Sequence, residues 1–413
     1  MAAPSTGKTA LVLSGGGARG AYEVGVVRYL REELPKRLGR MPRLDILCGT
    51  SVGAINATYL AATANDPVNQ AQRLANHWHS LKIGEMVDLS LSDLVRAGRL
   101  LMGGRPRSDK AAMGAGGILN TAGLQRFVVR RVPWRGIANN LAAGHFNALS
   151  ISATHVASGN TVVFVQNREG SLPPWSRDPF VRARAAEIGP AHVLASAAIP
   201  VLFPAVPIDS AFYCDGGLRQ NTPLSPALRL GADRVLVVSL RHMPTRREAV
   251  AVAGEHLRDY PSAWFLLGKA LNALLLDHTE YDLDRLHRMN AIFDGGIRAY
   301  GESFVEQINN VLMPLRGQGI RLVRDLLIRP SRDIGALAAT HARRPRLAEI
   351  GGVMGRALRF LSGESTEADL LSYVLFDRDY SSDLIELGMS DARAREEELV
   401  AFFEDRPALQ AVS

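Results

Sequence analysis

Near its N-terminus the chain reads Leu44-Asp45-Ile46-Leu47-Cys48-Gly49-Thr50-Ser51-Val52-Gly53-Ala54-Ile55-Asn56-Ala57. The mostly apolar residues at 44–48 predict a short buried strand, and the small and apolar residues at 52–62 predict a helix. The G-x-S-x-G pentapeptide at 49–53 lies between them. Strand, tight turn, serine and helix follow one another in the order of a nucleophile elbow, so Ser51 is a candidate nucleophile.

The two glycines of the pentapeptide, Gly49 and Gly53, are expected to support this turn. Glycine lets the chain bend sharply and lets one backbone segment pass close to another. A serine hydroxyl is a weak nucleophile, and a sharp turn holds it where a base can reach it. The same pentapeptide also occurs in ordinary Gly-Ser loops, so the interpretation needs support from other parts of the chain.

Strands and helices alternate along the first part of the chain. Strands are predicted at Ala10–Leu13, Asn147–Thr154, Thr161–Gln166, Ala211–Cys214 and Arg234–Leu240. Nearly continuous apolar strands separated by helices predict a layered α/β fold with a mainly parallel sheet. Beyond Arg241 the pattern is mostly helical, with a late strand predicted at Leu326–Pro330, and this last part is expected to pack on the core.

The composition is that of an ordinary globular protein, with 413 residues of which 47% are hydrophobic and 22% charged. The longest apolar run, 193–208, is broken by prolines and does not reach the roughly 18 residues that span a bilayer. No basic start followed by a long apolar stretch is present, so we expect no secretory signal and predict a cytoplasmic location. Cys48 and Cys214 are too few for a disulfide framework and are expected to be small buried side chains, with a disulfide between them as the alternative.

The net charge of +7 is compatible with two kinds of partner, nucleic acid and an anionic membrane surface. The sequence has no helix-turn-helix, RNP or zinc-finger pattern, so nucleic acid is not expected. The arginine-rich stretch 96–110 and the apolar stretch 264–276 suggest peripheral contact with a membrane. The alternatives are a general bias toward arginine and, for 264–276, a core helix.

A glycine-rich loop follows the first predicted strand and reads Gly15-Gly16-Gly17-Ala18-Arg19-Gly20. Backbone N–H groups of glycines can point at one oxygen atom, so Gly15, Gly16 and Gly17 are candidates for an oxyanion hole. Arg19 is expected to hold the loop or to assist with charge. Nucleotide binding is the alternative, because Gly15, Gly17 and Gly20 match G-x-G-x-x-G. Against it, the loop lacks the Gly-Lys-Ser/Thr ending of a P-loop, and no acidic residue ends the second strand.

A serine nucleophile also needs a base. Among the histidines that come late enough for the order found in α/β-hydrolases, His242 comes closest to a predicted strand end. Asp215 also ends a predicted strand, and Gly216 and Gly217 after it leave its carboxylate uncrowded. Burial would raise the pKa of Asp215 above about 3.9 and make it a better base. An Asp-Gly turn with no catalytic role explains the same residues.

These motifs, taken together, resemble those of the patatin-like phospholipases. That family carries a G-G-G-x-R/K-G loop, a G-x-S-x-G elbow and a D-G-G/A motif in this order, and here they stand at 15–20, 49–53 and 215–217. The segment Ala195–Pro204 also looks like the family's sequence between the elbow and the aspartate. The resemblance covers about Thr9 to Leu240.

The resemblance implies a three-layer α/β/α fold with a mainly parallel central sheet. Residues 9–240 would form the catalytic domain, and residues 241–413 a mostly helical extension packed on it. It also implies hydrolysis of carboxylic ester bonds in lipids, with a lipid or phospholipid as substrate and with neither metal nor cofactor. A non-catalytic lipid-binding scaffold and an acyltransferase are the alternatives on the same fold, and the oligomeric state does not follow from the motifs.

For the site, the resemblance implies a catalytic dyad without histidine. Ser51 would be the nucleophile and Asp215 the base. The oxyanion hole would be formed by Gly15, Gly16 and Gly17, with Arg19 supporting it. Four further glycines would support the motifs, namely Gly49, Gly53, Gly216 and Gly217.

Overall fold

The computed structural model describes residues 7–86, 121–175, 179–200, 202–245, 279–316, 319–344 and 369–404. The two stretches for which we predict membrane contact, 96–110 and 264–276, lie outside these residues. Among the helices in the described ranges, none combines the length and the apolar composition needed to cross a bilayer.

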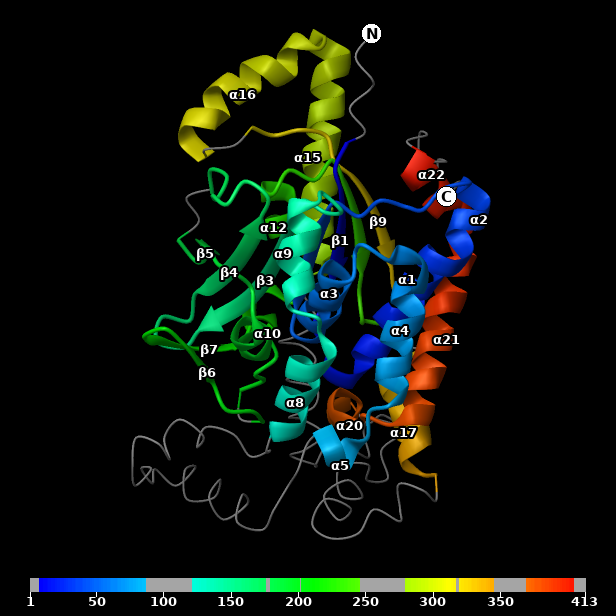
Figure 1. Cartoon of the computed structure of the whole chain (residues 1–413). Coiled ribbons are helices and arrows are strands. Elements are labelled where there is room, and N and C mark those ends of the chain that lie inside the picture. The colour runs from blue at the N-terminus through cyan, green and yellow to red at the C-terminus, as the bar shows by residue number, and fades with distance from the viewer. Residues whose placement is uncertain are drawn as a thin grey trace.

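A nine-stranded sheet forms the centre of the described part of the molecule (Figure 1). Its strands are β1 (Thr9–Leu13), β2 (Ile46–Thr50), β3 (Ala148–His155), β4 (Thr161–Asn167), β5 (Val181–Ala185), β6 (Val206–Ile208), β7 (Ala211–Asp215), β8 (Arg234–Val238) and β9 (Arg324–Ile328). The main order is β5-β4-β3-β2-β1-β8-β9, and the strands from β3 to β9 along this order are parallel. This confirms the predicted α/β fold. The late strand is confirmed as β9, which begins earlier than predicted, at Arg324.

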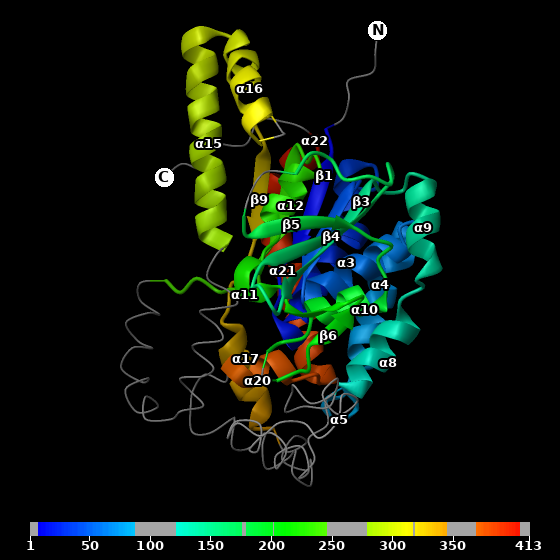
Figure 2. The same ribbon diagram turned by 90° about the vertical axis from the view of Figure 1, so that its left-hand side faces the viewer.

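Helices cover both faces of the sheet, as Figure 2 shows. One face carries α1 (Ala21–Arg28), α3 (Val52–Ala62), α4 (Pro67–His79), α9 (Arg135–Ala142), α20 (Asp369–Val374) and α21 (Arg378–Ala394), and the other carries α12 (Leu224–Arg229) and α15 (Thr279–Tyr300). Successive residues of β1 point to opposite faces, so Leu11 and Leu13 join the larger core and Ala10 and Val12 the smaller one. Two cores separated by a sheet make the fold a three-layer α/β/α structure.

The remaining helical segments are short or lie at the edges of the molecule. They are the 3-10 turn η1 (Gly17–Gly20), the π-helical turn η2 (Tyr29–Glu33), α2 (Leu34–Leu38), α5 (Ile83–Met86), α8 (Ala122–Arg131), α10 (Pro190–Ser196), α11 (Gly217–Gln220), α16 (Ser303–Arg316), α17 (Ile334–Ala342) and α22 (Glu396–Glu404). In both views the α15–α16 pair projects beyond the end of the sheet away from α20 (Figures 1 and 2).

One flank of β3 is shared by two strands whose C-terminal ends meet. The parallel strand β2 ends at Thr50, which pairs with Ser152. The antiparallel strand β7 ends at Asp215, which pairs with Ala153, the next residue of β3. Because β2 and β7 approach from opposite directions, Ser51, which follows Thr50, comes to lie beside Asp215.

The C-terminal helices pack directly against the first helix, as seen for α21 beside α1 in Figure 1. The two helices approach closely where Gly25 faces Gly388. A Cβ atom built on Gly25 would lie 2.0 Å from the carbonyl oxygen of Ile385, and one built on Gly388 would lie 2.1 Å from that of Tyr22. Only glycine permits such a close approach. The division of the chain at residue 240 stays a prediction.

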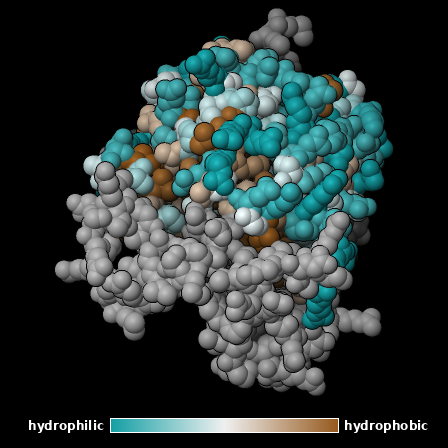
Figure 3. Space-filling model, turned by 60° about the horizontal axis from the view of Figure 1, so that its bottom comes forward, coloured by the Kyte–Doolittle hydropathy of each residue, from teal (hydrophilic) through white to brown (hydrophobic). Residues whose placement is uncertain are grey.

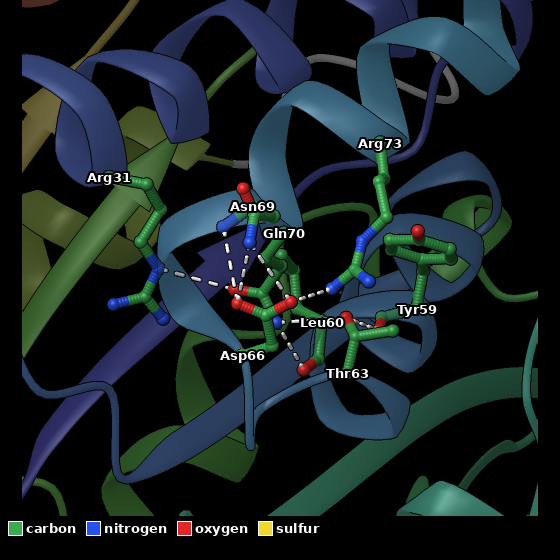
Figure 4. Close-up of polar contacts among 8 residues, drawn as sticks. All are labelled: Arg31, Tyr59, Leu60, Thr63, Asp66, Asn69, Gln70 and Arg73. Carbon is green, nitrogen blue, oxygen red and sulfur yellow. Dashed lines mark hydrogen bonds and ion pairs between the residues drawn. The ribbon is translucent and has the colours of Figure 1, made fainter.

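A buried glutamine fixes α4 to the end of α3 (Figure 4). The side-chain amide of Gln70 donates to the carbonyl oxygen of Leu60 at 2.8 Å and to the hydroxyl of Thr63 at 2.9 Å. Its oxygen accepts a hydrogen bond from Nε of Arg31 at 3.2 Å, and Asp66 caps the N-terminus of α4. These bonds set the position of α4 relative to the helix that follows Ser51.

Candidate active site

Ser51 has the backbone conformation of a nucleophile elbow. Its φ is 54° and its ψ is −124°, a strained region for a residue with a side chain. A Cβ atom on Gly49 would lie 2.3 Å from the carbonyl oxygen of Gly53, and one on Gly53 would lie 2.4 Å from that of Leu13. Both glycines are therefore required by close backbone contacts, as the motif predicts.

A buried serine outside the three motifs supports this turn. The N–H of Ser51 donates to Oγ of Ser196 at 2.8 Å, and the Ser196 hydroxyl donates to the carbonyl oxygen of Ser152 at 2.6 Å. Ser196 thus connects the elbow to β3. No sequence motif points to Ser196, although it lies within the Ala195–Pro204 segment that resembles the family.

The carboxylate of Asp215 is buried and its two oxygens have different surroundings. Oδ1 accepts the N–H of Gly217 at 2.7 Å, which forms the Asp-Gly turn considered for this motif. Oδ2 has no hydrogen-bond partner among the described residues. The ends of β2 and β7 place Ser51 beside this residue. Asp215 therefore forms a turn with one oxygen, and its other oxygen accepts no hydrogen bond from the described residues.

Burial is the largest influence on the charge of this carboxyl group. It raises the pKa of Asp215 to about 7, because a buried carboxylate loses its hydration. The hydroxyl of Ser51 and the N–H of Gly217 act in the opposite direction and lower the pKa. The group therefore changes charge near neutral pH.

The glycine-rich loop lies beside Ser51 and is held by Asn221. The N–H of Gly15 donates to the backbone oxygen of Asn221, and the Asn221 side-chain amide donates to the Gly15 carbonyl oxygen, both at 3.2 Å. The N–H of Gly15 is therefore already bonded. The N–H groups of Gly16 and Gly17 have no acceptor among the described residues.

Arg19 is buried and connects this loop to α20. Its Nε donates to Oγ of Ser372 at 2.7 Å, and its guanidinium carbon lies 4.3 Å from the centre of the Tyr373 ring. A Cβ atom on Gly17 would lie 2.1 Å from the Tyr373 carbonyl oxygen. Through these contacts the arginine side chain points toward the C-terminal region and holds the glycine-rich loop against α20.

An apolar pocket adjoins Ser51 and has an empty volume of about 420 Å³, which includes space open to solvent. It is lined by Gly17, Ser51, Val52, Ile55, Trp78, Leu81, Met86, Leu124, Phe127, Ala197, Ile199, Phe203, Tyr373 and Phe376. Figure 3 shows apolar side chains among hydrophilic ones on the side of the molecule nearest the C-terminal ends of β1 and β2, the end of the sheet where Ser51 lies. Such a lining suits a hydrocarbon chain.

The sequence profile of the patatin-like phospholipases matches residues 11–228. The chain belongs to the patatin-like phospholipase family. Among solved structures, VipD from Legionella pneumophila is 14% identical with a TM-score of 0.30, over 92% of this chain and 67% of VipD. The type III effector ExoU is 16% identical with a TM-score of 0.23, over 90% of this chain and 77% of ExoU. No curated protein matches the sequence.

As patatin-like phospholipases are lipid acyl hydrolases, the family supports ester chemistry on lipids for this chain. No histidine among the described residues hydrogen-bonds to Ser51 or Asp215, and Nδ1 of His242 lies 3.0 Å from the carbonyl oxygen of Pro330. Cys48 and Cys214 are both buried and free of disulfides. Within the described ranges, no group of three His, Cys, Asp or Glu side chains is placed to hold a metal ion.

Proposed function

We propose that this patatin-like phospholipase hydrolyses carboxylic ester bonds of lipids, with Ser51 as the nucleophile and Asp215 as the base. The observation that supports the proposal is the meeting of the β2 and β7 ends, because Ser51 follows β2 and the buried Oδ2 of Asp215, at the end of β7, has no hydrogen-bond partner among the described residues. A buried polar atom without a partner needs an explanation, and a catalytic role is one of those known. The apolar pocket beside Ser51 supports an acyl chain as the bound group.

In the first half of the reaction, Oγ of Ser51 attacks the ester carbonyl carbon and its proton moves to Oδ2 of Asp215. The carbonyl oxygen becomes an oxyanion. When this intermediate collapses, the bond between the carbonyl carbon and the alkoxy oxygen breaks. Asp215 then returns the proton to the leaving alcohol, and the acyl group stays on Ser51.

In the second half, water attacks the acyl-serine carbonyl carbon and gives a proton to Asp215. Collapse of the second intermediate breaks the bond to Oγ of Ser51, which takes the proton back as the fatty acid leaves. A base works best when its pKa lies near the operating pH. A carboxyl group with a pKa of about 7 fits both proton transfers.

The oxyanion would be stabilised by the N–H groups of Gly16 and Gly17. Both are without an acceptor among the described residues, whereas the N–H of Gly15 is bonded to Asn221. Gly15 and Arg19 would then hold the loop in place. Removing one preorganised donor from an oxyanion hole reduces kcat by about 10²–10³-fold in other hydrolases.

The test compares wild type with Ser51→Ala on a panel of phospholipids, lysophospholipids and simple esters. We expect Ser51→Ala to lower the hydrolysis rate by about 10³-fold or more and to abolish labelling by a fluorophosphonate probe. Ser381→Ala is the matched control, because Ser381 is a buried serine on α21, away from the pocket lining. It should keep both activity and labelling.

Two outcomes would overturn the proposal. One is a Ser51→Ala protein that still hydrolyses the esters at the wild-type rate, and the other is a folded wild type that turns over none of the panel. Reactions with added glycerol or lysolipid distinguish hydrolysis from acyl transfer, because transfer gives a new ester and hydrolysis gives a free fatty acid. Cytoplasmic location and peripheral membrane contact stay predictions.

A further inference from the structure

The pocket beside Ser51 has two walls of different origin. Most of its lining residues belong to the family-matched region, which ends at residue 228. Tyr373 and Phe376, which also line it, come from α20 and the turn that follows it. The C-terminal region therefore supplies part of the space that lies next to the nucleophile.

Tyr373 is held against the glycine loop by its backbone and by its ring. Its carbonyl oxygen touches the position where a Cβ atom of Gly17 would be, and its ring lies under the guanidinium group of Arg19. Only 2% of its surface is exposed. A side chain fixed in this way cannot swing out of the pocket without moving the loop.

Phe376 is held by a tight turn between α20 and α21. The Phe376 N–H donates to the carbonyl oxygen of Val374 at 2.8 Å. The next residue, Asp377, caps α21 by accepting the N–H groups of Asp379 and Tyr380 at 3.0 and 3.1 Å. This places Phe376 at a fixed point of the backbone, with 6% of its surface exposed.

Phe376 packs against Trp78 of α4, which also lines the pocket. Its ring centre lies 6.3 Å from that of Phe376, with 31° between the ring planes. The indole N–H donates to Oδ1 of Asn56 on α3 at 3.1 Å, which fixes the orientation of the indole ring. Phe376 and Trp78 are thus two anchored aromatic side chains that pack against each other and close this part of the pocket.

We propose that Phe376, supported by Tyr373, determines which acyl-chain lengths the pocket accepts. This inference rests on the proposed function and extends it to the acyl part of the substrate. Because both aromatic side chains are anchored and pack against each other, they cannot separate freely to admit a longer chain. One methylene more or less in an apolar pocket changes kcat/KM by roughly tenfold or more.

The experiment measures kcat and KM for p-nitrophenyl esters from butanoate to palmitate. Phe376→Ala removes one of the two rings and lengthens the pocket, and we expect the ratio of kcat/KM for palmitate over octanoate to rise about tenfold. Phe376→Trp places a larger ring there and shortens the pocket, and the same ratio should fall. Phe402→Ala is the matched control, because Phe402 is an equally buried phenylalanine on α22 that contacts Phe403 and does not line the pocket.

Opposite shifts in the two Phe376 variants, with no shift in Phe402→Ala, support the inference. An unchanged chain-length profile in folded Phe376→Ala or Phe376→Trp overturns it. Binding of octanoate and palmitate to proteins carrying Ser51→Ala, measured by calorimetry, tests the pocket without turnover. If wild type hydrolyses no ester but Phe376→Ala still shifts this binding preference toward palmitate, the proposed function fails and the inference on the pocket stands.

Discussion

Asn221 binds Gly15 through two hydrogen bonds, although the two residues are 206 positions apart in the sequence. The backbone oxygen of Asn221 accepts the Gly15 N–H, and its side-chain amide donates to the Gly15 carbonyl oxygen. The pair joins the glycine loop after β1 to the segment that follows Asp215. The proposed oxyanion donors and the proposed base are therefore positioned by the same contact.

Asn221→Ala should lower kcat with little effect on KM. The substitution removes the side-chain bond to Gly15 and leaves the backbone bond, so the loop becomes looser and the donors less well aligned. We expect kcat to fall about tenfold or more, since a preorganised donor contributes several kcal/mol. Steady-state kinetics on the preferred ester measure this. A change confined to KM would mean that Asn221 acts on substrate binding instead.

Gly17→Ala should destabilise the protein and remove most of its activity. Gly17 has a φ of 59°, and a Cβ atom there would lie 2.1 Å from the carbonyl oxygen of Tyr373. Gly39→Ala is the matched control, because Gly39 has a φ of 66° and no atom within 4 Å of the added Cβ.

The left-handed backbone alone costs about 1–2 kcal/mol for alanine, so Gly39→Ala should lower the free energy of unfolding by that amount and keep full activity. Gly17→Ala should lower it further, because the added methyl group must displace α20 or the loop. Urea unfolding of both variants measures the difference. Equal losses in the two variants would show that the close contact with Tyr373 is absent in solution.

The activity should rise with pH through an ionisation near 7. Asp215 must be ionised to accept the Ser51 proton, and burial raises its pKa to about 7. The kcat/KM of wild type should therefore be low at pH 5 and level off above pH 8. Asp215→Asn should be inactive at every pH. A profile that is flat between pH 5 and pH 8 would exclude Asp215 as the titrating base.

The stability of Asp215→Asn relative to wild type should increase with pH. The pKa of Asp215 is about 7 in the folded chain and about 3.9 in an unfolded one, so the folded state holds the proton more tightly. The stabilisation from this proton is fully present below about pH 4 and is lost as the pH rises through 7. Asparagine does not ionise, so Asp215→Asn loses no stability from this source over the same pH range.

Because the pKa values of the folded and unfolded states differ by about three, the free energy of unfolding of wild type should fall by roughly 4 kcal/mol as the pH rises from below 4 to above 7. Free energies of unfolding measured at pH 5 and pH 8 should therefore differ more for wild type than for Asp215→Asn. The pH-independent effect of the substitution cancels in this comparison. If the free energies of unfolding of the two proteins differ by the same amount at pH 5 and pH 8, the carboxyl group does not gain or lose a proton in this range.

The elbow could be predicted from the sequence because its requirements are local. Gly49, Ser51 and Gly53 lie within one pentapeptide, and the strand and helix on either side have clear hydrophobic patterns. The Asp-Gly turn at Asp215 could also be predicted and is confirmed, whereas the role of Asp215 as a base stays a prediction. The turn uses Oδ1, and Oδ2 has no partner among the described residues, so the two interpretations concern different atoms of one side chain and are compatible.

Other features could not be predicted because they depend on sheet register and on contacts between distant segments. The meeting of β2 and β7 requires both strands to pair with neighbouring residues of β3. No local pattern gives Ser196 its bond to the Ser51 N–H, or turns Arg19 toward Ser372. For the same reason the role of Gly15 in bonding to Asn221 was not expected from a loop of three equivalent glycines.

The contact between Arg19 and Ser372 joins residues 353 positions apart. A ribosome makes the chain from its N-terminus, so Ser51 and the glycine loop emerge long before Tyr373 and Phe376, which also line the pocket. Products of interrupted translation or of proteolysis that end before α20 would contain Ser51 and Asp215 but lack one wall of this pocket. Selection among lipids by the proposed acyl site would therefore be acquired only after α20 has been made.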